Sequence, residues 1–98
     1  MLSIGKEAVF VFNAFEMLTP TGNAVEKIVT EYGVAPEKCF AIGYANCFNG
    51  YLAPSAECVV RTYETGGAAH WIGIPECCVK SELTVLDAVK EMSADLIA

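Results

Sequence analysis

The sequence has few basic residues and a single histidine. Lysine and arginine total six against twelve aspartates and glutamates, which gives a formal net charge of −6. Proteins that bind nucleic acid normally carry a basic stripe, and this chain has none, so we expect no nucleic-acid partner. The acidic residues are scattered and are expected to form a solvated surface. His70 alone defines no catalytic or metal-binding pattern, and we expect it to pack in a loop beside Trp71.

Long apolar runs are also missing. Hydrophobic residues make up 54% of the chain, yet no run approaches the ~20 residues that a membrane-spanning helix needs. The short apolar run near the N-terminus lacks the length and cleavage site of a signal peptide. We therefore expect no transmembrane segment, and a cytoplasmic location for the chain as written.

The five cysteines form no C-x-x-C pair and have no zinc-finger spacing. Their odd number and the adjacency of two of them argue against a secreted disulfide framework. We expect reduced thiols that serve as small core residues in a cytosolic protein. They are Cys39, Cys47, Cys58, Cys77 and Cys78.

Two apolar segments separated by a helical pattern predict an α/β fold in one domain over residues 1–98. Ala8–Phe12 and residues 40–45 are expected to be strands buried on both faces, with Gly43 permitting close packing or a bulge. The helix between them is predicted for residues 20–32, with Thr19 as its N-cap. This β-α-β order requires adjacent parallel strands joined by a right-handed crossover.

The remaining segments are less regular. Gly33 is expected to end the first helix in a left-handed conformation. A loop is predicted from residue 46 to about residue 56, and another for residues 65–75. Residues 58–63 suggest a third strand, and residues 81–97 have the apolar periodicity of a C-terminal helix. The whole is expected to be part of a three-layer α/β arrangement.

Glu16 and Tyr51 are the best candidates for a functional site. Each follows one of the predicted parallel strands, and ligands of open α/β sheets bind at the carboxyl ends of the strands. The two side chains are therefore expected to converge at that edge. Other roles remain open, because Glu16 could favour the following helix through its dipole and Tyr51 could be a packing aromatic.

The same segments resemble the neutral, non-lysosomal ceramidases. The run IGKEAVFVFNAFEMLTPTGNAV is similar to a family segment of the form IG-x-apolar run-PGE-x-T-x-x-x-G. The run GYANCFNGYLAPSAEC, followed by RTYETGG, is similar to a later segment of the form G-x-x-N-x-y-x-x-Y-x-x-x-x-x-E and a YE-containing stretch. Together they cover most of residues 4–67 in the same order. Here Asn13, Ala14 and Phe15 replace the family's Pro-Gly lead-in.

That resemblance implies a fragment of a larger three-layer α/β hydrolase domain, the C-terminal part of a catalytic domain that carries its Glu/Tyr half. In the family, a zinc ion held by two histidines, a glutamate and a tyrosine serves hydrolysis of the amide bond of ceramide. Glu16 and Tyr51 match the metal ligands, and Tyr51 would also be catalytic. The histidines and the catalytic serine correspond to sequence upstream of Ile4, and His70 matches neither histidine. Family members are often secreted or membrane-associated.

Two functions follow from these observations. The chain could supply the glutamate and tyrosine ligands of a zinc-dependent hydrolase in sphingolipid metabolism that acts on N-acyl lipid-like or other amides. A missing N-terminal half or a partner chain would then supply the histidines, and the isolated chain would be inactive and bind zinc weakly. Alternatively, it is a small stand-alone α/β domain that binds a partner or ligand without catalysis. For the hydrolase segment we expect an exposed apolar face and self-association or a partner chain, whereas a monomer would favour the stand-alone domain.

Overall fold

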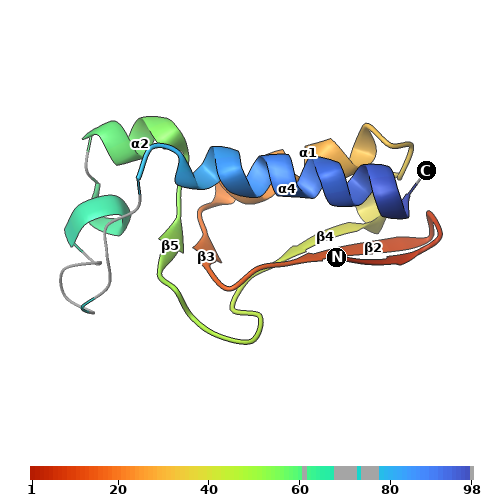
Figure 1. The fold of residues 1–98 in the computed structure, drawn as a ribbon, viewed down its shortest axis with the longest axis horizontal. Helices are drawn as coiled ribbons and strands as arrows, with labels where there is room; N and C mark the ends of the chain where they lie inside the picture. The colour runs from red at the N-terminus through yellow and green to blue at the C-terminus, as the bar shows by residue number, and fades with distance from the viewer. Residues whose placement is uncertain (61, 68–72, 74–77, 98) are drawn as a thin grey trace.

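The computed structural model describes residues 1–60, 62–67, 73 and 78–97. These residues form a mixed α/β fold of short strands beside two longer helices (Figure 1). The elements in chain order are β1 (Leu2–Ile4), β2 (Ala8–Phe12), β3 (Glu16–Met17), α1 (Thr19–Thr30), η1 (Pro36–Lys38), β4 (Cys39–Ile42), β5 (Tyr51–Leu52), α2 (Ser55–Val60), η2 (Tyr63–Gly67) and α4 (Ser81–Leu96).

The main sheet has the strand order β1-β2-β4. Strands β2 and β4 are parallel neighbours, with Val9 opposite Cys39 and Phe12 opposite Ile42. This confirms the predicted β-α-β unit, with β2 at its predicted bounds and β4 ending earlier than expected. Strand β1, which the sequence did not reveal, pairs antiparallel with β2.

Helix α1 begins and ends for identifiable reasons. Leu18 is its N-cap in an extended conformation, and a proline stands in the first turn. Backbone N–H groups there have no partner within the helix, so the N–H that proline lacks costs no hydrogen bond. Thr19 is therefore the first helical residue, and the prediction that it is the N-cap is wrong. Gly33 has a φ of 84°, the left-handed conformation predicted for the residue that ends the helix.

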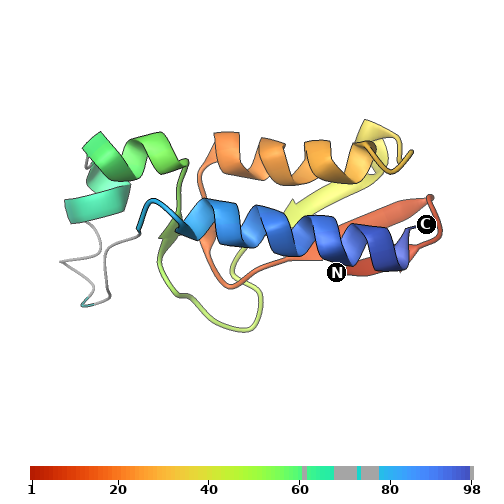
Figure 2. The same ribbon diagram turned by 45° about the horizontal axis from the view of Figure 1, so that its top comes forward.

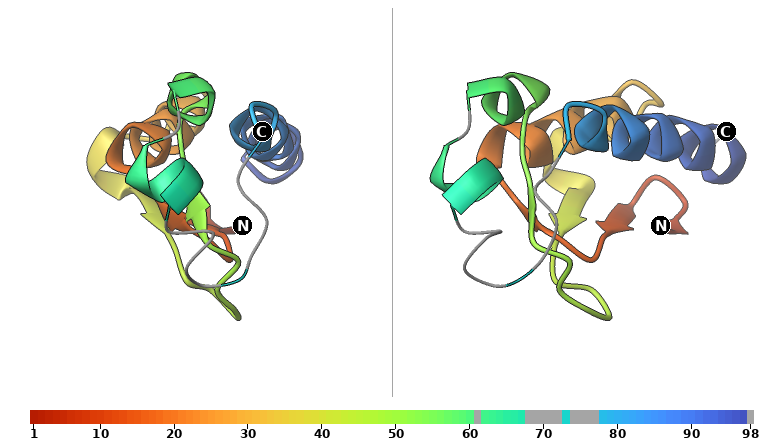
Figure 3. Two further views of the ribbon diagram at one scale, coloured as in Figure 1. Left: turned by 90° about the vertical axis from the view of Figure 1, so that its left-hand side faces the viewer. Right: turned by 60° about the vertical axis from the view of Figure 1, so that its left-hand side comes forward.

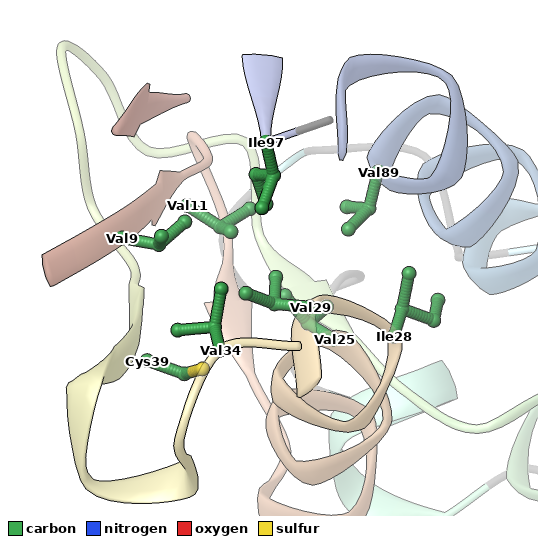
Figure 4. Packing of buried hydrophobic residues seen from close by; sticks show 9 residues of the cluster. All are labelled: Val9, Val11, Val25, Ile28, Val29, Val34, Cys39, Val89 and Ile97. Atoms are coloured by element: carbon green, nitrogen blue, oxygen red, sulfur yellow. The ribbon is translucent and has the colours of Figure 1, made fainter. Parts of the chain in front are cut away.

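Both long helices lie on the same face of the main sheet. Figure 2 shows α1 and α4 running side by side, and the left view of Figure 3 shows both of them on one side of the strands. Valines from the strands and helices meet between these layers (Figure 4). The core residues are Val9, Val11, Val25, Ile28, Val29, Val34, Cys39, Val89 and Ile97. The described residues thus form two layers.

Several predictions for the second half of the chain need correction. Residues 58–63 do not form a strand, because Ser55–Val60 is helix α2, and Pro54 precedes it at the position where a helix readily begins. The loop predicted from residue 46 contains β5, and Tyr63–Gly67 is a π-helical turn. The C-terminal helix is confirmed as α4. Most of residues 68–77, including His70, lie outside the described residues.

The cysteines also depart from expectation. Cys39 is a buried free thiol, as predicted, and Cys47 and Cys78 are free and exposed. Cys58, however, is disulfide-bonded, so the expectation of reduced thiols throughout is wrong for this residue. Among the described helices, none has both the length and the apolar character needed to cross a membrane.

Candidate functional site

A second pair of strands brings Glu16 and Tyr51 together. Strands β3 and β5 are parallel, and Glu16 is the direct cross-strand partner of Tyr51. The Glu16 N–H donates to the Gly50 carbonyl at 2.8 Å, and the Leu18 N–H donates to the Leu52 carbonyl at 2.9 Å. Cross-strand partners project their side chains on the same side of a sheet. The predicted convergence is therefore confirmed, although both residues lie in short strands and not in loops.

Backbone hydrogen bonds fix the loop between β4 and β5 against the segment before β3. The Tyr44 N–H donates to the Phe15 carbonyl at 3.1 Å, and the Asn49 N–H donates to the Ala14 carbonyl at 2.7 Å. The close approach requires glycine at position 43, because a Cβ atom there would lie 2.6 Å from the Phe15 carbonyl oxygen. The close packing predicted at Gly43 is confirmed.

Tyr44 adopts an unusual backbone conformation at this site. Its φ is 55°, in the left-handed region that bulky residues rarely occupy. Such strain persists only where the surrounding structure fixes the backbone, and it is enriched at functional positions. The hydrogen bond from the Tyr44 N–H to Phe15 provides that constraint. As a result, the Tyr44 phenol is held near Glu16.

Four aromatic rings form a row beside the Glu16 carboxylate, which we call the aromatic row. The Tyr44 and Phe48 rings stack with centroids 5.5 Å apart. Phe48 meets Tyr51 edge to face at 6.4 Å, and Tyr51 meets Tyr63 in the same way at 6.5 Å. These spacings are within the favourable range for aromatic pairs. Phe48 and Tyr63 are exposed, so the row presents apolar surface to solvent.

The carboxylate of Glu16 keeps the neighbouring phenols protonated. Hydrogen bonding to Glu16 is the main reason that the pKa of Tyr44 is raised to about 12. The pKa of Tyr51 is also raised, first by desolvation and then by the negative charge of Glu16, with further contributions from Tyr63 and Glu64. Both phenols are therefore neutral hydrogen-bond donors at physiological pH.

A cavity of about 260 Å³ adjoins the aromatic row at the beginning of α1. Its polar lining includes the carboxylates of Glu16 and Glu26, together with the side chains of Asn23 and Tyr44. Glu26 is partly engaged, because its Oε1 accepts the Ala41 N–H at 3.2 Å. Met17 and Leu18 supply apolar walls. The cavity lies near the carboxyl end of β4, where ligands of α/β sheets bind.

The donor set present satisfies only part of a zinc site. Within the described part of the chain, no three His, Cys, Asp or Glu side chains lie close enough together to hold a metal ion. Glu16 offers a carboxylate and Tyr51 a phenol, whereas zinc sites in proteins normally have at least three protein ligands. Coordination by Tyr51 would also require the ion to lower the raised pKa of its phenol. Glu16 and Tyr51 alone therefore do not make up a zinc site.

Two serines and two residues near Tyr51 have structural partners. The Ser55 hydroxyl donates to the Val79 carbonyl at 2.7 Å, and the Ser81 hydroxyl accepts the Cys78 N–H at 3.1 Å. Tyr63 and Glu64 lie near Tyr51, in agreement with a supporting role. The sequence reasoning missed Tyr44, although it follows directly after β4 and Gly43, at the edge where site residues are expected.

Comparison of the chain with protein-family models, curated proteins and solved structures finds no match.

Proposed function

We propose that this chain supplies the glutamate and tyrosine part of a zinc-dependent amide hydrolase site that resembles neutral ceramidase. The observation that carries the proposal is the register of β3 and β5, which makes Glu16 the direct neighbour of Tyr51. The resemblance assigns these two residues as zinc ligands, and their proximity is what a shared ion requires. Histidine ligands would come from another segment, because the chain contains only one histidine.

In this site, Glu16 and Tyr51 would hold the ion, and the Tyr51 phenol would also contact the substrate. Zinc, when bound, polarises the scissile carbonyl and activates a water molecule. In the metal-free chain the phenols of Tyr44 and Tyr51 are both protonated at physiological pH, as an ordinary tyrosine phenol with a pKa of about 10 is. A neutral phenol can donate a hydrogen bond to the oxygen on which negative charge develops during attack on the amide carbon. Tyr51 is the better placed of the two for this role, since it is the partner of Glu16.

The surroundings of the site support an N-acyl lipid-like substrate. The aromatic row extends from the cavity through Phe48 and Tyr51 to the exposed ring of Tyr63. Exposed aromatic surface of this kind accommodates acyl chains by excluding water from both surfaces. The polar lining of the cavity near Glu16 and Asn23 would suit the more polar end of an amide substrate.

Calorimetric titration with zinc tests the role of Glu16. We expect weak binding by the chain alone, and stronger binding when imidazole is added in place of the histidine ligands. Glu16→Gln should weaken binding at least about tenfold, because a coordinating oxygen is replaced by a poorer ligand. Glu31→Gln is the matched control, since Glu31 is exposed at the end of α1 and should leave zinc binding unchanged.

A fluorogenic N-acyl amide assay completes the test. The isolated chain should show no turnover, because two oxygen ligands hold zinc poorly. Zinc binding that survives Glu16→Gln unchanged would remove Glu16 from the site. Zinc-dependent turnover that survives both Glu16→Gln and Tyr51→Phe would show that the reaction uses other residues.

A second candidate function is a binding domain without catalysis. It is favoured by the protonated phenols, because a phenol with a raised pKa is a hydrogen-bond donor and a poor metal ligand. Such a domain would bind the same N-acyl amide with an affinity that added zinc does not change. A zinc-dependent affinity would favour the hydrolase site.

The proposal also concerns the larger domain and the compartment to which the chain would belong. The chain would belong to a larger three-layer α/β domain, of which it forms the Glu/Tyr half. The cytoplasmic location expected from the sequence remains a prediction. Disulfides persist mainly in oxidising compartments, so the disulfide at Cys58 favours a secreted or extracytoplasmic setting.

A further inference from the structure

The main sheet has one face that no described helix or strand covers. Helices α1 and α4 pack against Val9, Val11 and Cys39, whereas the opposite face is open in Figure 1. The strand registers place Leu2 beside Phe10, Phe10 beside Phe40, and Phe12 beside Ile42 on that opposite side. Every side chain there is apolar. This open face consists of Leu2, Ile4, Ala8, Phe10, Phe12, Phe40 and Ile42.

The side chains of the open face are all apolar, as is typical of a sheet surface that is buried against another layer. A sheet with one face in water normally alternates apolar and polar residues, whereas parallel strands that are apolar on both sides are buried on both sides. Phe40 stacks on Phe10 with centroids 5.1 Å apart, and Phe12 continues the stack at 6.2 Å. The rings thus form a continuous apolar surface, and burial of that surface would be strongly favourable.

We propose that the open face is the contact between two copies of this chain, related by a twofold axis. The two sheets would pack face to face about 10 Å apart, as in a β-sandwich. In such an isologous contact the same residues meet from both sides. This interface lies apart from the proposed zinc site, which is in the β3–β5 pair, and it takes the place of the third layer that a larger three-layer domain would have on this face.

The size of the open face is sufficient for a stable dimer. Leu2, Ile4, Phe12 and Phe40 are 52%, 58%, 43% and 42% exposed. If a large side chain presents roughly 200 Å² when fully exposed, these four alone expose about 400 Å² in each copy. Apolar atoms make up about 65% of homodimer interfaces, so the pair would bury about 1,200 Å² in total. That value lies at the lower limit of specific interfaces.

Charge favours a second copy over a partner of different composition. The open face contains no charged side chain, so two copies can meet there without placing like charges opposite each other, despite a net charge of −6 on each. A basic partner attracted by the acidic surface would find nothing to pair with on this face. An uncharged, flat and apolar surface is complementary to itself.

Sedimentation equilibrium of the metal-free chain, with chelator present, tests the proposal. We expect a reversible monomer–dimer equilibrium over micromolar to millimolar concentrations. Phe40→Lys should raise the dimer dissociation constant at least about tenfold, because it places a charge within the apolar interface. Leu83→Lys is the matched control: Leu83 is also an exposed large hydrophobic residue but lies on α4, and the dissociation constant should change by less than about twofold.

Phe12→Lys provides a second variant at the other end of the ring stack, and circular dichroism checks that each variant remains folded. A folded wild-type chain that stays monomeric at millimolar concentration would overturn the proposal and favour a different polypeptide as the occupant. Equal weakening by Leu83→Lys would place the interface on α4. Irregular, open-ended association would also contradict a closed dimer.

Discussion

The two ends of the molecule are built in different ways. At one end, which we call the core end, β1, β2 and β4 pack against α1 and α4 through fully buried valines such as Val9 and Val29. At the other, the site end, β3, β5 and the loop at residues 43–50 are connected mainly by backbone hydrogen bonds. Their aromatic side chains remain largely exposed.

This difference separates stability from function. Burial of apolar side chains is the dominant stabilising term in a fold, and most of the buried apolar residues belong to the core end, although Leu52 in β5 is also fully buried. The site end gains little from burial, but it positions Glu16, Tyr44 and Tyr51 through fixed backbone geometry. Side-chain changes at the site end should therefore alter binding and titration more than stability, provided that the backbone contacts stay intact.

The largest effect is expected where the site end depends on backbone contact. Gly43→Ala would place a Cβ 2.6 Å from the Phe15 carbonyl oxygen, and neither backbone segment can move without breaking hydrogen bonds. We expect a loss of about 2–3 kcal/mol in the free energy of unfolding. Denaturant unfolding measures it.

Gly22→Ala is the control for this prediction. No atom lies within 4 Å of a Cβ built at Gly22, which lies inside α1. The substitution should stabilise the chain by about 0.5–1 kcal/mol, because alanine favours helix more than glycine does. Equal effects of the two substitutions would show that the close approach at Gly43 is absent.

At the core end, Val29→Ala should cost about 2 kcal/mol, because it removes two buried methyl groups and leaves a cavity. Val60→Ala is matched in chemistry but lies on α2 with 70% of Val60 exposed, and it should change stability by less than about 0.5 kcal/mol. Thermal or chemical unfolding compares them. Similar losses in both variants would contradict the placement of the core.

Glu82 on α4 links this helix to α1 and to the start of α2. Its Oε2 accepts the hydroxyl of the fully buried Thr21 at 2.7 Å, and its Oε1 accepts the Ser55 N–H at 3.4 Å. Glu82→Ala should destabilise the chain by about 1–2 kcal/mol, because it leaves the Thr21 hydroxyl buried without a partner. The exposed Glu91 on the same helix serves as control, and Glu91→Ala should be close to neutral. Equal losses of stability in Glu82→Ala and Glu91→Ala would show that the hydrogen bonds of Glu82 do not stabilise the fold.

The core end was largely predictable from the sequence. Continuous apolar runs identified β2 and β4, and the 3.6-residue period identified α1 and α4. Strand β1 was missed because three residues carry too short a pattern. The segment of α2 was mistaken for a strand because Val59 and Val60 have high strand propensity, whereas Pro54 and the local hydrogen bonds favour a helical turn.

The site was predictable in position but not in detail. Topology alone placed Glu16 and Tyr51 at the carboxyl edge, since parallel strands end at the same side of a sheet. No sequence pattern indicated that each would begin a short strand of its own. Tyr44 was missed because its role depends on a left-handed backbone conformation, which sequence rules assign to glycine or asparagine.

A pH titration of the tyrosine phenols, monitored by NMR of the ring signals, tests whether Glu16 lies beside Tyr44 and Tyr51. The pKa of Tyr44 is raised to about 12 in the folded chain, first of all by Glu16. In Glu16→Gln it should fall towards the ordinary value of about 10.

Because this pKa is higher in the folded chain than in the unfolded chain, the interaction stabilises the fold below about pH 10. That contribution should disappear as the pH rises through about 12. Between roughly pH 9 and pH 11, we expect Tyr44 to stay protonated in the wild type and to ionise in Glu16→Gln. Superimposable titration curves for the two proteins would contradict it.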